Sequence, residues 1–376
     1  MNDEIQEKWT GRVIVCVDLN AFYSSCEELR DQSLKGKSHA VIMTDQEKGK
    51  ITKGVISTCS YEARNYGIKS AMTLSEALSL NPNLILVPVD INYYSQISKK
   101  VMGILEDFSN IIEKASIDEA FLDCTEKRGQ VLPEEYAMNI KSAIKDRCGL
   151  SCSVGVTSTK ASAKIAADYR KPNGLTVVYP YNLKKFLEPL DVGSVAGIGP
   201  KTQQKLREMG IETLGQLALT EVEKLIQQFG VNGEWMWQVA NGIDNEQVTP
   251  RGDSISISSE TTLSSHTRDK NKIKAILENL VDEIYERAGS QNYLFRTVGI
   301  KLVRADFTIE TREITLQVFS ETKLSIASEI NPLLNRFTYS TEQPAVRKVG
   351  LKLSNLIRSY DLQKIRTIQK TIPDYF

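Results

Sequence analysis

The chain has 376 residues, of which 41% are hydrophobic, so it can bury more than one core and should divide into two to four domains. No run approaches the roughly 18 apolar residues of a membrane helix, and the first residues lack the features of a signal peptide, so we expect a cytoplasmic protein with no membrane partner. Its 47 Lys and Arg equal its 47 Asp and Glu, although 19 basic residues against 15 acidic ones from position 250 onward support nucleic-acid binding weakly.

The cysteines and histidines do not form a metal-binding or catalytic pattern. Six Cys are scattered through predicted strands and helices without paired zinc spacing, and only two His could assist them. We therefore expect reduced, mostly buried thiols, and we exclude a zinc centre or a His-based catalytic site. These residues are Cys16, Cys26, Cys59, Cys124, Cys148, Cys152, His39 and His266.

The first 180 residues alternate strand-like and helical patterns, which predicts mixed α and β elements around one sheet. A small module at 31–89 is inserted into that sheet. The expected order is strand 12–17, helix 22–29, strand 40–43, strand 55–59, a helix carrying Tyr61 and Arg64, helix 93–108, two strands within 111–124, helix 133–147, strand 151–156, helix 160–170 and strand 175–178.

Two further regions follow along the chain. The pattern from Leu183 to Gly242 is almost wholly helical, and a polar linker beginning at Asn245 separates it from the last unit. That unit is predicted to be a split βαβ arrangement. Its expected elements are a strand, a helix near 270–288, strands 294–303 and 308–319, a helix at 321–335 and a strand at 346–356.

Three acids at the ends of two strand-like runs give the strongest chemical signal. Asp18 ends one apolar run, and Asp118 with Glu119 stands inside another. Burying carboxylates without a cation is costly, and together they form a hard-oxygen site suited to Mg²⁺ and thus to phosphate chemistry. Adjacent strand residues point to opposite faces, so the backbone must turn or bulge between Asp118 and Glu119. Asp123 is a decoy, and a solvated turn is the alternative interpretation of the acid pair.

A second signal lies in the helical region. Gly197 and Gly199 can form a hairpin between helices whose backbone N–H groups face a DNA phosphate, with Lys201 and Lys205 adding sequence-independent attraction. Such a helix-hairpin-helix grips the DNA backbone without reading bases. A plain turn between packed helices is the alternative.

Alternation in the last unit separates the two faces of its sheet. Apolar residues should pack on the helices, while the lysines face outward. A basic face interrupted by glycine suits the DNA backbone, and a merely solvated face is the alternative. The inward residues are Val298, Ile300, Leu302, Val349, Leu351 and Leu353, and the outward ones are Lys301, Lys348, Gly350 and Lys352.

Four motifs resemble, in order and spacing, those of the Y-family, or translesion, DNA polymerases of the polymerase IV type. They are Asp18-Leu-Asn-Ala-Phe-Tyr, Ser60-Tyr-Glu-Ala-Arg, Ser116-Ile-Asp-Glu-Ala and Lys164-Ile-Ala-Ala-Asp-Tyr-Arg-Lys-Pro-Asn-Gly, and the match covers positions 11–357. The resemblance implies a multidomain α/β (α+β) fold like a right hand. Its parts would be a palm (11–30 and 90–180), small fingers (31–89), an all-helical thumb with the helix-hairpin-helix (181–244), a linker (245–256), a split-βαβ little finger (257–357) and a tail (358–376).

The resemblance also implies site residues. Asp18, Asp118 and Glu119, with the backbone carbonyl of Leu19, would hold two Mg²⁺ ions, and Tyr23 would be the steric gate that excludes a 2′-hydroxyl. Many family members carry a second Asp where this chain has Asn20, but Asn also occurs there. The nucleotide-binding residues would be Asn20, Ala21, Phe22, Tyr23, Ser57, Thr58, Tyr61, Arg64 and Lys171.

The chain ends in Gln369-Lys-Thr-Ile-Pro-Asp-Tyr-Phe, which resembles a peptide that docks on a ring-shaped sliding clamp. Gln369, Ile372, Tyr375 and Phe376 would be its anchors, since apolar anchors belong in a pocket. A fraying terminus is the alternative. This form of the peptide suits archaeal and eukaryotic clamps, so we expect an archaeal source.

These signals predict a monomeric, template-directed DNA polymerase that binds primer-template DNA, dNTPs and a sliding clamp. The predicted domains leave no room for a proofreading exonuclease, and small fingers would enclose the nascent pair loosely, so we expect low fidelity and lesion bypass. Two other functions are considered. A nucleotide cyclase could use strand-borne acids and two metals, and a catalytically silent scaffold could keep the clamp tail.

Overall fold

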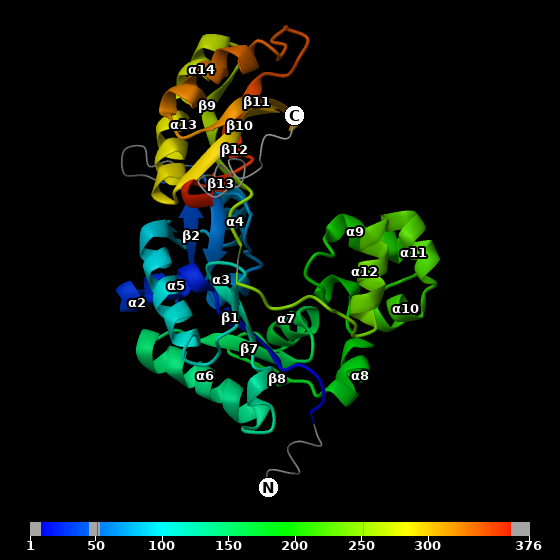
Figure 1. Ribbon diagram of the computed structural model, residues 1–376. Coiled ribbons are helices and arrows are strands. Elements are labelled where there is room, and N and C mark those ends of the chain that lie inside the picture. The colour runs from blue at the N-terminus through cyan, green and yellow to red at the C-terminus, as the bar shows by residue number, and fades with distance from the viewer. Residues whose placement is uncertain (1–8, 45–50, 52, 251, 362–376) are drawn as a thin grey trace. The chain divides into compact units, whose positions relative to one another are not determined.

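The computed structural model describes residues 9–44, 51, 53–250 and 252–361. The chain separates into two compact units, Met1–Arg251 and Gly252–Phe376, and Figure 1 labels most of their helices and strands. None of the helices that the described residues form is both long and apolar enough to cross a membrane. The cysteines are all free thiols and all but Cys148 are buried, as expected.

The described residues of the first unit build a five-stranded sheet in the order β5-β6-β1-β7-β8. β1 pairs antiparallel with β6 and β7, and β7 pairs parallel with β8. Every residue of β1 is buried, which suits its β-branched and apolar composition. The strands are β1 (Ile14–Leu19), β5 (Ile112–Lys114), β6 (Glu119–Asp123), β7 (Cys152–Thr157) and β8 (Leu175–Val177).

Helices cover both faces of this sheet. Val13, Val15 and Val17 point into a core shared with α2, α5 and α6, whereas Ile14 and Cys16 point to the face on which α7 packs. Figure 1 shows α5 and α6 on one side of β1 and α7 on the other. The helices are α2 (Phe22–Arg30), α5 (Ile91–Leu105), α6 (Pro133–Cys148) and α7 (Lys160–Tyr169).

Gly155 in β7 lets α7 lie close against the sheet. A Cβ atom there would stand 2.2 Å from the carbonyl oxygen of Ala163 and 2.4 Å from the amide nitrogen of Ala167. Both neighbours are backbone atoms of a packed helix, so they cannot move aside as a flexible side chain can. This close packing brings Lys164 of α7 to the end of β1, where it contacts Asp18.

A three-stranded sheet in the order β3-β2-β4 forms a small module with its own core. β2 pairs antiparallel with β3 and parallel with β4. A capping box between Thr73 and Glu76 begins α4. The elements are β2 (His39–Met43), β3 (Val55–Cys59), β4 (Ile85–Pro88), α3 (Tyr61–Arg64) and α4 (Leu74–Leu80).

The stretch 183–240 is largely helical, as its pattern predicts. Its core is continuous with Ile165 and Ala166 of α7, so the bundle packs on the side of that helix. Gly230, with φ of 63°, makes the bend between α11 and α12. The helices are α8 (Leu183–Leu187), α9 (Pro200–Glu208), α10 (Leu214–Leu219), α11 (Val222–Phe229) and α12 (Val231–Ala240).

The segment after α12 packs against the rest of the first unit. The Arg12 guanidinium donates to the carbonyl oxygen of Glu246 at 2.7 Å. Lys160 is only 8% exposed and pairs with Glu113 at 2.8 Å and with Glu246 at 2.6 Å. Val248 is buried on the α7 side of the sheet. The beginning of the predicted linker is therefore docked on the sheet rather than surrounded by solvent.

The second unit contains a sheet in the order β11-β10-β12-β9, with β13 paired to β10. Neighbouring strands are antiparallel, so β9 and β10 run parallel with β12 between them, the predicted split βαβ arrangement. The elements are β9 (Ser256–Thr267), α13 (Lys270–Ser290), β10 (Tyr293–Arg304), β11 (Ile309–Ser320), α14 (Lys323–Leu334), β12 (Val346–Ser354) and β13 (Ile357–Arg358).

The two faces of this sheet differ as predicted. The apolar side chains pack with residues of α13 and α14 in one core. Lys301, Lys348 and Lys352 are partly exposed and lie on the opposite face. The buried inward residues are Val298, Ile300, Leu302, Val349, Leu351 and Leu353.

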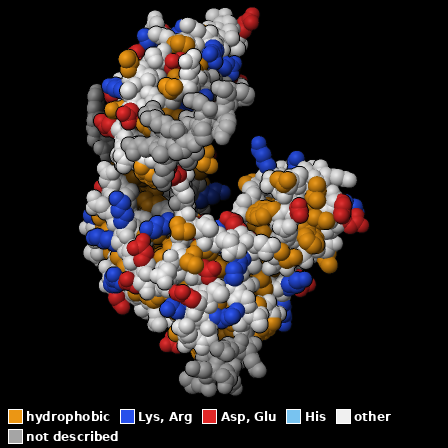
Figure 2. Space-filling view, in the orientation of Figure 1, with side chains coloured by type: hydrophobic (Ala, Val, Ile, Leu, Met, Phe, Trp, Pro, Cys, Tyr) orange, Lys and Arg blue, Asp and Glu red, His pale blue; other side chains and the backbone are white. Residues whose placement is uncertain are grey.

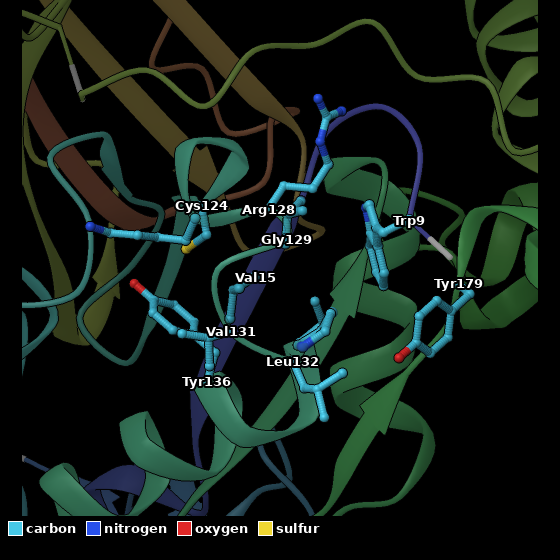
Figure 3. A pocket seen from close by; sticks show the side chains of 13 residues that line it. Trp9, Val15, Cys124, Arg128, Gly129, Val131, Leu132, Tyr136 and Tyr179 are labelled. Atoms are coloured by element: carbon cyan, nitrogen blue, oxygen red, sulfur yellow. The ribbon is translucent and has the colours of Figure 1, made fainter. Parts of the chain in front are cut away.

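A small apolar pocket lies at the opposite end of β1 from Asp18. Its lining includes Val13, Val15 and Tyr136, and Figure 3 shows the side chains around it. Its volume of about 20 Å³ leaves room for little more than one water molecule. Its lining holds no carboxylate, so this pocket is not where the predicted acids meet.

Candidate functional site

A cavity of about 470 Å³ opens at the end of β1. Its walls come from the β1–α2 junction, from β3 and α3, from the turn before β6, and from α7 with the loop that follows it. Every predicted metal ligand and nucleotide-binding residue except Asn20 lies in the lining. The lining residues are Asp18, Leu19, Ala21, Phe22, Tyr23, Ser57, Thr58, Tyr61, Arg64, Ser70, Ile117, Asp118, Glu119, Lys164 and Lys171.

The three acids reach this cavity from two paired strands. Asp18 stands directly opposite Glu119 in the β1–β6 register. Asp118 precedes β6, in a turn where the Ser116 amide donates to the Glu119 carbonyl at 3.2 Å. The predicted turn between the two adjacent acids is thus confirmed. The Ser116 hydroxyl donates to the Asp118 carboxylate at 2.5 Å and holds it in place.

Lys164 joins two of these acids. Its Nζ lies 2.5 Å from Asp18 Oδ2 and 2.5 Å from Glu119 Oε2. Burial raises the pKa of Glu119, because the charged form is poorly solvated there. Burial, the largest single influence, would lower the pKa of the Lys164 ammonium, but its neighbours, led by the Asp18 carboxylate, together outweigh it and the pKa is raised. A charged lysine therefore compensates two carboxylates that are largely buried.

The acids suit a divalent cation in their chemistry, although a lysine now joins them. Within the described residues, no three His, Cys, Asp or Glu side chains form a ready-made metal cluster. The Lys164 ammonium acts as a stand-in cation, since carboxylate oxygens of two strands already converge on it. Hard oxygen donors of this kind suit Mg²⁺. The residues therefore fit the metal, provided that Lys164 gives way.

Two nearby polar residues lie outside the cavity. Asp123 lies opposite Ile14, at the other end of β6 from Glu119, and its carboxylate accepts from the Thr125 amide at 2.9 Å. Asp123 therefore caps the local backbone at Thr125 and does not join the three acids of the cavity. The Asn20 amide hydrogen-bonds the hydroxyls of Ser151 and Ser153 and is 2% exposed. Its side chain therefore holds strands together and does not line the cavity.

Tyr23 forms one wall on α2. Its ring stacks on Tyr94, with centroids 4.4 Å apart and planes 16° from parallel. The Tyr94 hydroxyl donates to Glu27 Oε1 at 2.7 Å, so the supporting ring is itself fixed. Burial raises the pKa of Tyr23 and keeps the phenol neutral. The ring is thus a rigid, uncharged surface, as a steric gate requires.

The side chains predicted to bind the triphosphate line another wall. The Arg64 guanidinium lies 4.6 Å from the centre of the Tyr61 ring, so the two residues of α3 act as one unit. Ser57 and Thr58 of the adjoining β3 line the cavity beside them. Burial raises the pKa of Tyr61, which leaves its hydroxyl able to donate. A guanidinium beside a phenol is well suited to phosphate oxygens.

Lys171 completes the basic side of the cavity. Its Nζ lies 2.7 Å from Asp18 Oδ1 and 2.7 Å from Asp168 Oδ1. The loop that carries it is tied down by Lys141, which donates to the carbonyl oxygens of Asn173 at 2.9 Å and Gly174 at 3.1 Å. Asp18 therefore receives two ammonium groups in the protein on its own.

The predicted helix-hairpin-helix ends in a helix of suitable polarity. Gly197 has φ of 103°, a conformation that favours glycine, and a Cβ there would meet the Trp235 ring at 3.0 Å. Gly199 caps α9 and Lys201 lies in its first turn. The backbone N–H groups at this start carry the positive end of the helix dipole.

The lysines predicted to face DNA in the second unit are ion-paired. Lys301 Nζ lies 2.8 Å from Glu260 Oε1, and Lys348 pairs with the other oxygen of that carboxylate. Lys352 Nζ lies 2.9 Å from Glu313 Oε1. The predicted clamp anchors, Gln369, Ile372, Tyr375 and Phe376, fall outside the described residues.

Sequence reasoning missed several residues that shape the site. Lys164 and Asp168 stand four apart on α7, a spacing that places both on one helix face, and both belong to a motif already singled out. That spacing could have drawn attention to them. Tyr94, the support of Tyr23, and Lys141 lie in unremarkable helical patterns, and nothing local marks them.

Comparison with known proteins accounts for most of the chain. The impB/mucB/samB family matches residues 17–168, the C-terminal domain of that family matches 254–365, and the IMS family HHH motif matches 180–211. The chain is 39% identical over 346 residues to DNA polymerase IV of Methanoculleus marisnigri, which covers 92% of this chain and 95% of that protein.

Solved structures agree with this assignment. A Y-family DNA polymerase chimera superposes with a TM-score of 0.84 and an insertion ternary complex of Dbh DNA polymerase with 0.66, each 28% identical over 92% of this chain and 100% of theirs. The expected fold class is confirmed, and the cyclase and silent-scaffold alternatives are set aside. The paired acids, the cavity that they line and the near full-length match lead to one conclusion: the chain belongs to the Y-family DNA polymerases of the polymerase IV type.

Proposed function

We propose that this polymerase adds deoxynucleoside triphosphates to a primer 3′ end in the cavity at the end of β1. One observation carries the proposal: acids from two paired strands line the same cavity as Arg64 and Lys171. Nucleotidyl transfer needs negative groups for cations and positive groups for a triphosphate within reach of each other. This arrangement supplies both.

Asp18, Asp118 and Glu119, with the Leu19 carbonyl, would hold two Mg²⁺ ions. When bound, two such cations stabilise the attacking and leaving oxygens of an in-line phosphoryl transfer. Two features of the protein position these acids. The β1–β6 register sets Asp18 beside Glu119, and the Ser116 hydroxyl holds the Asp118 carboxylate.

Tyr61, Arg64 and Lys171 would bind the triphosphate. Their donors come from two sides of the cavity, α3 and the loop after α7, so a chain of phosphates between them would be held along its length. The small side chains of Ser57 and Thr58 would lie over the nascent base pair. Ala21, Phe22 and Asn20 would contribute at the β1–α2 junction, Asn20 through its backbone.

Tyr23 would select the sugar. Its ring is backed by Tyr94 and cannot retreat without breaking the stack. A ribose 2′-hydroxyl placed against this ring would clash, whereas deoxyribose would fit. The gate would therefore act by shape rather than by charge.

The remaining regions would grip DNA. Residues 11–30 with 90–180 would be the palm, 31–89 the fingers, 181–244 the thumb, and 257–357 the little finger beyond a linker at 245–256. Gly197, Gly199 and Lys201 would bind backbone phosphates from the thumb, and Lys301, Lys348 and Lys352 from the little finger. A fingers module as small as 31–89 supports low-fidelity synthesis and lesion bypass, because loose enclosure of the nascent base pair selects weakly.

The tail at 358–376 would bind a sliding clamp through Gln369, Ile372, Tyr375 and Phe376. The enzyme would act as a monomer in the cytoplasm. Free, mostly buried thiols support a reducing compartment.

Primer extension tests the assignment of the acids, with a matched control in the same strand region. Asp118→Asn should lower extension on an undamaged template by at least about a hundredfold, the scale for losing one group that stabilises transition-state charge. Asp123→Asn removes a neighbouring acid outside the cavity and should extend within about twofold of the parent. Equal losses in both variants would remove Asp118 from the site.

A further inference from the structure

The outer face of the second unit's sheet carries acids as well as lysines. Two rows across its strands share one pattern, in which a glycine separates an acid from a lysine. The rows are Glu313–Gly299–Lys352 across β11, β10 and β12, and Glu260–Gly350–Lys301 across β9, β12 and β10.

Each glycine has no side chain, which leaves room for the acid on one neighbouring strand to reach the lysine on the other. A Cβ at Gly350 would stand 2.7 Å from Glu260 Cγ, and one at Gly299 would stand 3.0 Å from Glu313 Cγ. Any larger residue would push the carboxylate away from the sheet. The acids therefore lie flat across a strand and pair with Lys301 and Lys352, two strands away.

These pairs are accessible to solvent and ions. The side chain of Glu260 is 25% exposed, and its partners Lys301 and Lys348 are 34% and 32% exposed. Burial, the largest single influence, would raise the pKa of Glu260, but the hydrogen bonds to the two lysines and their charges together outweigh it and the pKa is lowered. Pairs of this exposure are weak individually, so another anion can compete for the lysines.

Charges of both signs are interspersed over the visible surface of the molecule (Figure 2). The same intermixing holds for the three lysines that we propose contact DNA on the little finger, because each of them pairs with Glu260 or Glu313. A DNA phosphate that approached this face would find carboxylates already bound to the lysine ammonium groups.

We propose that Glu260 and Glu313 are built-in competitors of DNA phosphate, which occupy the lysines of the little-finger sheet until DNA displaces them. This inference rests on the proposed DNA contact of Lys301, Lys348 and Lys352. The acids weaken DNA binding and favour release. The glycines position them for this role, because they leave the space through which Glu260 reaches Lys301 and Glu313 reaches Lys352.

Binding of the full-length chain to a fluorescent primer-template duplex, measured over a range of salt concentrations, tests the acids. Glu260→Gln should tighten binding by about three- to tenfold at low salt and steepen the salt dependence by about one unit, because the face gains one positive charge. Glu313→Gln should act in the same direction. Glu278→Gln is the matched control, since it also breaks a lysine pair, Lys274–Glu278, but lies on α13.

Gly350→Ala tests position apart from charge. It leaves net charge unchanged but places a Cβ against Glu260, so binding should tighten toward that of Glu260→Gln. Gly289→Ala is its control, because a Cβ there meets nothing within 4 Å. Thermal melting checks that each variant is folded.

The outcomes separate this inference from the proposed function. Lys301→Met and Lys348→Met should weaken binding severalfold. If they weaken it while Glu260→Gln matches Glu278→Gln, the DNA contact stands and the competitor role is wrong. If the lysine variants bind as the parent does, the contact itself is wrong, and the competitor role is overturned with it.

Discussion

Two regions of the molecule have charged side chains that we propose bind a ligand: the cavity at the end of β1 and the outer face of the second unit's sheet. In both, these side chains form ion pairs within the protein, but the sign of the proposed ligand-binding group and the degree of burial differ. In the cavity an ammonium, Lys164, joins carboxylates that we assign to metal. On the sheet, a carboxylate of Glu260 joins ammonium groups that we assign to DNA. Each region thus carries a substitute for the ligand that it would receive.

The surroundings decide how firmly each substitute is held. The side chains of Asp18 and Lys164 are 9% and 16% exposed, whereas Glu260 and Lys301 are 25% and 34% exposed. Removing one partner of a buried pair leaves an uncompensated charge, whereas an exposed pair contributes little. We infer that only a strongly binding cation displaces Lys164, while phosphates compete readily with Glu260.

Two glycines show the same contrast in packing. Gly155 faces the backbone of α7, and Gly350 faces the flexible side chain of Glu260. The first fixes the geometry of the cavity and the second leaves a movable charge.

The largest effect is expected from Lys164→Met in the protein without added metal. It should lower the free energy of unfolding by about 3 kcal/mol, because the largely buried Glu119 carboxylate loses its ion-pair partner and Asp18 keeps only Lys171 among the described residues. Adding Mg²⁺ should restore part of the lost stability. In a titration, Mn²⁺ should bind to the Lys164→Met variant more tightly than to the parent protein.

Lys160→Met is the control for this change. Lys160 is also buried between two acids, Glu113 and Glu246, but outside the cavity. The Lys160→Met variant should be less stable than the parent but should bind Mn²⁺ with the same affinity. Equal metal affinity in the parent and Lys164→Met would mean that the lysine does not compete with the cation, and the comparison of the two regions would fail.

Gly155→Ala should have the next largest effect. A methyl group pressed against helix backbone should cost about 2 kcal/mol of stability, as overpacked cores do. Gly350→Ala should change stability by less than about 0.5 kcal/mol, because the side chain that it meets can move. Urea denaturation measures both, and equal costs would show that the second glycine is as constrained as the first.

Tyr23→Ala should have a smaller effect than Lys164→Met and Gly155→Ala, and it tests what the cavity selects. Removing the ring should raise ribonucleotide incorporation relative to deoxyribonucleotide by at least about tenfold, equivalent to about 1.4 kcal/mol. DNA affinity should stay at the parent value. Glu260→Gln should do the reverse, with altered affinity and unchanged sugar selection. An unchanged sugar preference in Tyr23→Ala would rule out the gate.

Much of this could be predicted because it depends on local pattern. The alternation in β10 and β12 identified the buried residues, and the apolar runs around Asp18 and Asp118 located β1 and β6, within which or next to which these acids lie. The motif beginning at Lys164 marked the right helix. Asn20 shows the limit, since its place in the motif gave no sign that its side chain turns toward Ser151 and Ser153.

The amino-acid sequence by itself determined the order of the elements, the family, and which acids and bases stand at strand and helix ends, because periodicity and motif spacing are local properties of the chain. Only the tertiary structure decided which charges meet. Lys164 finds Asp18 and Glu119 through the packing of α7 on β7, and Glu260 finds Lys301 through strand register across a glycine. Such partners are far apart in sequence, and their distance is set by packing and register.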